Sequence, residues 1–199
     1  MADDKSGRDK QARDSERRQR EREIRTELER GDETEPPIET GELAEIEAAV
    51  ESLSFPTTGA EVVEAVGDRE IETDVRTYTV EDLVPDADDE RFGSPAAVRT
   101  RIQRPVIAAA MKRIVEASGA LPNTKIGDSQ RTAYEKTLRE LKAIDADDAD
   151  EGVRVVADWI VDRIRDDEKL PGSRAVRRQA AAFCRANGYE IRNDDWLGI

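Results

Sequence analysis

The sequence predicts a mainly α-helical protein, with a small helical domain over residues 41–120 that has room for one short strand, and a three-helix domain over residues 121–199. Apolar residues after position 40 recur at intervals of three and four, which is the spacing of one helix face. Residue types that begin helices, and glycines that end them, punctuate the same region. The chain has 199 residues, of which 46 are acidic and 32 basic, so its apolar residues suffice for a modest core only.

Residues 1–40 are a charged, low-complexity segment that ends in a linker. They contain few apolar side chains, while acid–base pairs four residues apart, such as Asp9 and Arg13, favour a helix. We therefore expect a solvated single helix or a disordered tail, followed by a linker at Pro36 and Pro37. An arginine-rich arm that binds nucleic acid is the alternative, although the interleaved acids would be repelled by phosphate.

The first helix of the small domain is predicted from Leu43, Ile46 and Val50, which share one helix face. Thr58 stands three residues before Glu61, which is the spacing of a capping box and predicts the start of a second helix. A proline between the two segments ends the first helix before the second begins.

The remainder of the small domain combines a weak alternation with further helix starts. Residues 71–78 alternate weakly and predict a short strand or an extended crossing. Thr79-Val-Glu-Asp82 caps a further turn, and Ser94-Pro95 is typical of a helix start. Pro105 kinks or breaks this helix, and another helix is expected over residues 106–117.

Three strings in this region form a pattern: Leu53-Ser-Phe55-Pro56-Thr-Thr-Gly-Ala-Glu61, Tyr78-Thr-Val-Glu-Asp-Leu83 and Phe92-Gly-Ser94-Pro95-Ala-Ala-Val98. The succession of F/Y-P-x-T and F-x-S-P resembles a small domain family of unknown function that is abundant in haloarchaea, over residues 42–104. The resemblance implies a small helix-rich domain from a halophilic archaeon, with Phe55 and Phe92 in its core. It implies no reaction and no functional residues, because the family has no established activity.

The C-terminal domain is predicted as three helices joined by short loops. The first begins at Asp128, the second follows the acidic loop at residues 145–152, and the third begins at Arg174 and is closed by Gly188. We expect Trp196 to fold back onto the bundle. The layout is similar in architecture to helix-turn-helix and winged modules. Apolar residues with helical spacing are the candidate core: Tyr134, Leu138, Leu141, Val153, Val156, Ile160, Ile164, Val176, Ala180 and Phe183.

The composition excludes most catalytic designs. The sequence contains no histidine and one cysteine, Cys184, which excludes imidazole catalysis, a disulfide within the chain and cysteine-based metal clusters. The loop at residues 145–152 is not a calcium loop, because Ala149 stands at the fifth ligand position. We therefore predict a protein that is not an enzyme and uses no cofactor, metal or small-molecule substrate, with Cys184 as a small core residue.

The sequence predicts a soluble, cytoplasmic protein of a halophile with no membrane partner. No apolar run approaches the roughly 18 residues that span a bilayer, and the N-terminus is too charged for a secretory signal. Arginine outnumbers lysine 25 to 7 and the formal net charge is −14, a combination that resembles proteins of extreme halophiles. In molar salt the Debye length falls to about 3 Å, so this net charge does not indicate the partner.

Two segments are net basic although the whole chain is acidic. Residues 94–142 carry ten basic and four acidic groups, and residues 170–199 carry five and three. In the first segment Arg99, Arg101 and Arg104 are candidates for nucleic-acid contact. Because the basic residues of this segment spread around the helix, pairing with the strongly acidic segment before it explains them at least as well.

The last predicted helix carries the strongest functional pattern. At about 100° per residue, its four arginines fall within an arc of about 100°. Val176, Ala180 and Phe183 lie on the opposite side, and no acidic residue stands between Ser173 and Tyr189. A helix with an apolar back and an arginine front suits phosphates or guanine edges in a DNA groove. The four arginines are Arg174, Arg177, Arg178 and Arg185.

We therefore predict a non-enzymatic protein that associates with nucleic acid and docks this helix on DNA or RNA. A regulatory role is one such function. Two alternatives stay open. The arginines pair with the acidic residues 143–169 of the same bundle, or they bind an acidic protein and the chain is a protein–protein interaction adaptor. Exposure of the four side chains beside a groove would favour the first reading, and ion pairs within the bundle would oppose it.

Overall fold

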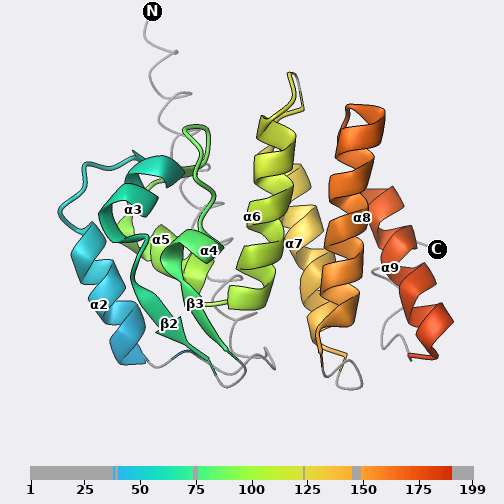
Figure 1. The fold of residues 1–199 in the computed structure, drawn as a ribbon, viewed down its shortest axis with the longest axis horizontal. Coiled ribbons are helices and arrows are strands. Elements are labelled where there is room, and N and C mark those ends of the chain that lie inside the picture. The colour runs from blue at the N-terminus through green and yellow to red at the C-terminus, as the bar shows by residue number, and fades with distance from the viewer. Residues whose placement is uncertain (1–37, 39, 74–75, 123, 145–148, 190–199) are drawn as a thin grey trace, which may run out of the picture. The chain divides into compact units, whose positions relative to one another are not determined.

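The computed structural model describes residue 38 and residues 40–73, 76–122, 124–144 and 149–189. These residues belong to one compact unit that is mainly α-helical, as predicted, with a few short strands (Figure 1). The predicted N-terminal helix or tail, the linker, the centre of the acidic loop and Trp196 lie outside the described residues. No described helix is long and apolar enough to cross a membrane.

Four helices and two small antiparallel sheets form the first part of the fold. The helices are α2 (Thr40–Val50), α3 (Gly59–Val66), α4 (Val80–Leu83) and α5 (Pro95–Ile102). In the sheets β1 (Thr57–Thr58) pairs with β4 (Arg91–Phe92), and β2 (Glu70–Glu72) pairs with β3 (Thr77–Thr79).

The weak alternation over residues 71–78 corresponds to a hairpin rather than to one strand. Ile71 of β2 lies opposite Tyr78 of β3, and both side chains are buried. Each strand supplies one apolar residue to the same face of the hairpin. A single extended crossing would not bring these two side chains together, so the pairing explains why the alternation is short and interrupted.

The helix starts form by the capping chemistry that the sequence indicates. At the start of α3, the Glu61 backbone N–H donates to Thr58 Oγ1 at 3.2 Å, and the Thr58 backbone N–H donates to Glu61 Oε2 at 2.8 Å. This capping box is confirmed. The hydrogen bonds that the Glu61 carboxylate accepts lower the pKa of Glu61, and the bond from the Thr58 backbone N–H has the largest effect. At the start of α5, the Ala97 backbone N–H donates to Ser94 Oγ at 3.3 Å.

Apolar side chains of the first part form a core that we call the first core. It includes residues from α2, α3, α4, α5 and both sheets: Ile46, Val50, Val62, Ile71, Leu83, Phe92, Val98 and Ile102. Phe92 is buried, as the resemblance implies, but Phe55 is only half-buried. Phe55 lies in the chain segment before β1 and packs against the margin of the first core instead of inside it.

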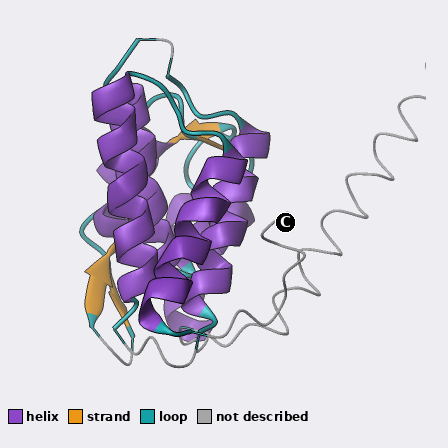
Figure 2. Cartoon of the chain, turned by 90° about the vertical axis from the view of Figure 1, so that its right-hand side faces the viewer, coloured by secondary structure: helices purple, strands orange, loops and turns teal. Residues whose placement is uncertain are grey.

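Four helices form the second part, where three were expected. They are α6 (Pro105–Gly119), α7 (Asp128–Lys142), α8 (Glu151–Asp167) and α9 (Ser173–Asn187). α6 lies beside α7 and α8, and α9 packs on the other side of these two helices (Figures 1 and 2). Ile107, Met111 and Ile114 of α6 enter the same core as Tyr134 and Ile160, which we call the second core. The fourth helix belongs here because most apolar side chains of α6 face this way.

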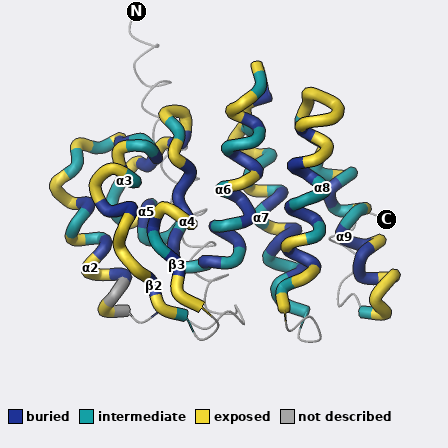
Figure 3. Tube along the Cα trace, viewed as in Figure 1, coloured by how far each residue is buried: buried dark blue, intermediate teal, exposed yellow. Residues whose placement is uncertain are grey.

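α6 connects the two cores, because Ala108 and Ala109 contact the first core while Ile107, Met111 and Ile114 belong to the second. Buried positions of α6 and α8 recur between half-buried or exposed ones along each helix, as the apolar spacing predicts (Figure 3). Gly188 ends α9 with φ of 71°, a left-handed conformation that glycine adopts without steric cost.

Candidate nucleic-acid interface

The apolar side of α9 anchors this helix firmly in the bundle. Val176, Ala180 and Cys184 are fully buried in the second core, and Ala181 and Phe183 are nearly so. Cys184 is therefore a small core residue, as predicted. Because this side is fixed by packing, the opposite side of α9 is held at the surface of the molecule.

Three of the four predicted arginines of α9 are exposed: Arg174, Arg178 and Arg185. We call this set the arginine face. Arg177 is half-buried at its edge and makes its own contacts within the protein. The structure thus brings three of the predicted residues together on one exposed helix surface, and the fourth lies partly beneath it.

The acidic segment before α9 pairs elsewhere. Asp150 accepts from Lys142 Nζ at 2.8 Å, Asp158 pairs with Arg113 of α6, and Asp167 pairs with Arg163 at 3.4 Å within α8. Among the residues that the structure describes, no carboxylate forms a salt bridge with the arginine face. The described contacts therefore favour solvent exposure of these guanidinium groups over pairing inside the bundle.

A hollow of about 460 Å³ opens beside the arginine face, between the end of α8 and the start of α9. We call it the Trp159 hollow, because a half-buried indole forms part of its wall. Arg178 belongs both to its lining and to the arginine face, so the two features are continuous. Its lining residues of greatest chemical interest are Trp159, Arg163, Asp167, Lys169, Arg178 and Gln179.

The loop that forms the floor of this hollow is held in place by α7. The Tyr134 hydroxyl donates to the carbonyl oxygen of Pro171, and Gln130 Nε2 lies 2.9 Å from the same oxygen. Burial raises the pKa of Tyr134 to about 12, and the hydrogen bond with Gln130 opposes this shift without cancelling it. The phenol therefore remains a protonated donor at every physiological pH, and the start of α9 has a fixed position.

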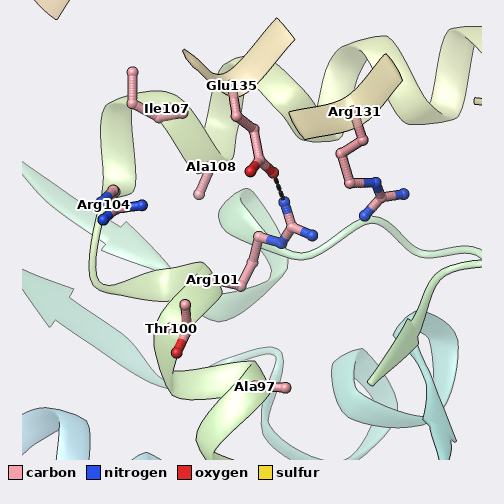
Figure 4. A pocket seen from close by; sticks show the side chains of 8 residues that line it. All are labelled: Ala97, Thr100, Arg101, Arg104, Ile107, Ala108, Arg131 and Glu135. Carbon is pink, nitrogen blue, oxygen red and sulfur yellow. Dashed lines mark hydrogen bonds and ion pairs between the residues drawn. The ribbon is translucent and has the colours of Figure 1, made fainter. Parts of the chain in front are cut away.

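The basic residues of α5 have a different environment from those of α9. Arg99 Nη1 lies 3.3 Å from Glu47 Oε2 on α2, and Arg101 pairs with Glu90 at 3.1 Å and with Glu135 of α7. These are the intramolecular pairs that we considered as the alternative. Arg104 precedes α6 and lines a cavity together with Arg101 (Figure 4). α5 and α9 lie on opposite sides of α6 and α8 (Figure 1), so these residues do not extend the arginine face.

The centre of this arrangement is a buried acid that the sequence did not reveal. The Glu90 side chain is 1% exposed, and Arg131 of α7 contacts both of its carboxylate oxygens. Arg101 and Arg131 are each 17% exposed. We call Glu90, Arg101, Arg131 and Glu135 the Glu90 cluster, and it links the first part of the fold to α7.

Electrostatic complementarity stabilises the charges of the Glu90 cluster. Burial lowers the pKa of the Arg131 guanidinium, but the hydrogen bonds and the charge of Glu90 outweigh this effect and raise the pKa above its usual value. The Arg131 guanidinium is therefore charged. A cavity of about 130 Å³ lies beside the cluster, lined by Thr100, Arg101, Arg104, Arg131 and Glu135 together with small apolar side chains (Figure 4).

Residues 40–114 match a family of unknown function (DUF5789). This segment covers the first part of the fold and most of α6, so it contains the resemblance noted over residues 42–104 and extends beyond it. Neither a curated protein nor a solved structure shows significant similarity to the chain. The arginine face and the Trp159 hollow lie outside the segment that matches the family, and the haloarchaeal origin stays a prediction.

Proposed function

We propose that this chain binds nucleic acid through the arginine face of α9 and carries out no reaction of its own. The observation that supports this proposal most is the contrast between the two sides of α9. One side is buried in the second core, and the other presents three exposed arginines without an acidic residue on the same helix.

The spacing of the arginine face suits several phosphates at once. With a rise of about 1.5 Å per residue, Arg174 and Arg178 are about 6 Å apart along the helix axis, and Arg185 follows about 10 Å further on. Guanidinium groups bind phosphate oxygens with two parallel N–H donors, and they remain charged at any physiological pH. Three such contacts on one rigid helix can follow a phosphate backbone.

The exposed acids at the end of α8 set the orientation of the proposed complex. Asp166, Asp167 and Glu168 would repel a phosphate that approached from the side of α8. The backbone is therefore expected to lie along α9. In the salt-rich cytoplasm of a halophile, which the composition favours, long-range attraction is screened, so binding there depends on close guanidinium contacts.

The test compares two variants with the same change in charge. The triple variant Arg174→Ala, Arg178→Ala and Arg185→Ala removes the arginine face. The matched control removes three exposed arginines from other elements: Arg69→Ala, Arg91→Ala and Arg165→Ala. Binding of fluorescently labelled DNA and RNA is followed by anisotropy over a series of KCl concentrations.

We expect the control to bind like the unaltered protein and the triple variant to bind more weakly. For duplex DNA, loss of three phosphate contacts should reduce the slope of log affinity against log salt by about 2.7. Equal binding by the two variants would contradict the proposal. Binding of acidic polypeptide such as polyglutamate, without binding of DNA or RNA, would instead support the protein adaptor.

A further inference from the structure

The Trp159 hollow combines an aromatic wall with cations, which is a different chemistry from that of the arginine face alone. Its volume of about 460 Å³ is within the range of sites that hold a small organic group. Trp159 comes from α8, Arg178 and Gln179 come from α9, and Lys169 comes from the chain between them. The hollow is therefore lined by groups that can contact a flat ring, its polar edge and a neighbouring phosphate.

Trp159 is held in position from two directions. Its indole packs against the second core. On its ring lies the guanidinium of Arg163, 5.6 Å from the ring centroid, and Arg163 is held in turn by Asp167 at 3.4 Å. A base that stacks on this face takes the place of the Arg163 guanidinium, while the packing of the indole against the second core keeps the ring in position.

The floor of the hollow is also preformed. The Pro171 carbonyl receives hydrogen bonds from Tyr134 and Gln130 of α7, so the loop between α8 and α9 is fixed before any ligand arrives. The distance between Trp159 and Arg178 across the hollow is therefore set by the bundle and not by a flexible loop. A preformed site of this kind discriminates ligands by shape.

A nucleobase is chemically complementary to the residues that line the hollow. Bases stack on aromatic side chains irrespective of sequence, because every base has a π-face. Gln179 offers an amide donor and acceptor for a base edge, and Lys169 and Arg178 offer cations for the flanking phosphates. In a duplex the bases are stacked on one another and cannot enter the hollow, whereas in a single strand they can be splayed out.

We infer that the Trp159 hollow binds an unstacked base, and that this protein prefers single-stranded to duplex nucleic acid. This inference rests on the proposed function, since Arg178 joins the hollow to the arginine face. Asp167 is the one carboxylate among the residues that line the hollow, and its charge opposes the phosphate of a bound nucleotide.

The experiment measures the affinity of single strands and of the duplex of the same sequence, in DNA and in RNA form. We expect the single strands to bind more tightly than the duplex. Trp159→Leu should weaken single-strand binding about tenfold, and Trp159→Phe should retain most of it, because one stacked base is lost only in the first variant. Asp167→Asn should strengthen binding severalfold.

A fluorescence measurement tests the inference independently of any folding defect in Trp159→Leu. In a Trp196→Phe variant, Trp159 is the one remaining tryptophan of the sequence. Saturation with a single strand should quench its emission, and the duplex should leave that emission nearly unchanged. This readout uses a chain whose hollow is intact.

The outcomes separate the inference from the proposed function. Equal affinity for duplex and single strand, or unquenched Trp159 emission at saturation, would overturn the inference while leaving nucleic-acid binding by the arginine face in place. Absence of binding to every nucleic acid would overturn both. A preference for single strands that survives in Trp159→Leu, together with unquenched Trp159 emission in the Trp196→Phe variant, would also overturn the role of the hollow.

Discussion

α5 carries two arginines and α9 carries four, and their environments are opposite. Arg99 and Arg101 of α5 are paired with carboxylates from other elements, and the central acid, Glu90, is 1% exposed. Arg178 and Arg185 of α9 are exposed and form no salt bridge with any residue that the structure describes. An excess of basic residues in a segment therefore does not show that its charges are available to a partner.

The difference arises from what each helix packs against. α5 lies where the loop before β4 delivers Glu90 and where α7 delivers Glu135, so its guanidinium groups have acids within reach. α9 packs on α7 and α8 through its apolar side chains. Asp158 and Asp167 of α8 pair with Arg113 and Arg163. Arg99 and Arg101 thus form contacts within the fold, whereas three arginines of α9 are exposed.

The largest effect that we predict is the loss of stability on Glu90→Gln. Removal of this carboxylate charge leaves the largely buried Arg131 without its salt-bridge partner and Arg101 with Glu135 alone, which is expected to cost about 3 kcal/mol or more. The measurement is the free energy of unfolding in urea. As a control, Glu47→Gln removes a half-exposed partner of Arg99 and should cost less than about 1 kcal/mol.

The dependence of these two stability costs on salt concentration gives a second test of this prediction. Exposed pairs are screened by molar KCl and buried pairs much less so, and the cost of Glu90→Gln should therefore persist while that of Glu47→Gln disappears. If Glu90→Gln were as mild as Glu47→Gln, the Glu90 cluster would not be what fixes the charges of α5, and the contrast between α5 and α9 would lose its physical basis.

A smaller effect is predicted at the anchor of α9. Tyr134→Phe removes the donor to the Pro171 carbonyl and should lower the free energy of unfolding by about 1 kcal/mol. The same variant should weaken binding in the Trp159 hollow, because the loop that forms its floor is less fixed. Unchanged stability would mean that Gln130 alone is sufficient to hold the loop.

The pH dependence gives an independent check on Tyr134. Its folded-state pKa is raised from 10.0 to about 12, so the folded protein holds this proton more tightly than the unfolded chain does. The stability that this group contributes is fully present below pH 10 and is lost as the pH rises from 10 towards 12. Tyr134→Phe should remove this part of the loss of stability at alkaline pH. If the free energy of unfolding of the variant had the same pH dependence as that of the unaltered protein, the prediction would be wrong.

The smallest effect on stability is predicted for the arginine face itself. Each of Arg174→Ala, Arg178→Ala and Arg185→Ala should change the free energy of unfolding by less than about 0.5 kcal/mol, because exposed side chains without partners contribute little. Alanine is also a better helix former. A triple variant that unfolds readily would show that these arginines have a structural role and that their exposure is not the relevant property.

Local signals in the sequence were sufficient for most of the helices. Thr58 with Glu61, Ser94 before Pro95, and Gly188 act through neighbours a few residues away, so their geometry follows from the local chain. The hairpin of β2 and β3 and the membership of α6 in the second core depend on contacts between distant segments. Periodicity identifies an apolar face but does not state which other face covers it.

Only the part of the candidate site that depends on local spacing was predictable from the sequence. The arginine face follows from helical spacing within α9 alone. Glu90 was not predictable, because it stands in a run of acids and nothing local distinguishes the one that becomes buried. Trp159 left a weak signal, since it flanks the apolar stripe of Val156 and Ile160 on α8, but the hollow that it lines together with the start of α9 arises only from the tertiary fold.

The most direct test of the account is chemical footprinting of arginines with a dicarbonyl reagent, read by mass spectrometry with and without single-stranded nucleic acid. We expect Arg174, Arg178 and Arg185 to react rapidly in the free protein and to be protected in the complex, whereas Arg101 and Arg131 should react slowly in both. Rapid reaction of Arg101 and Arg131, or an arginine face that stays equally reactive in the presence of saturating nucleic acid, would contradict it.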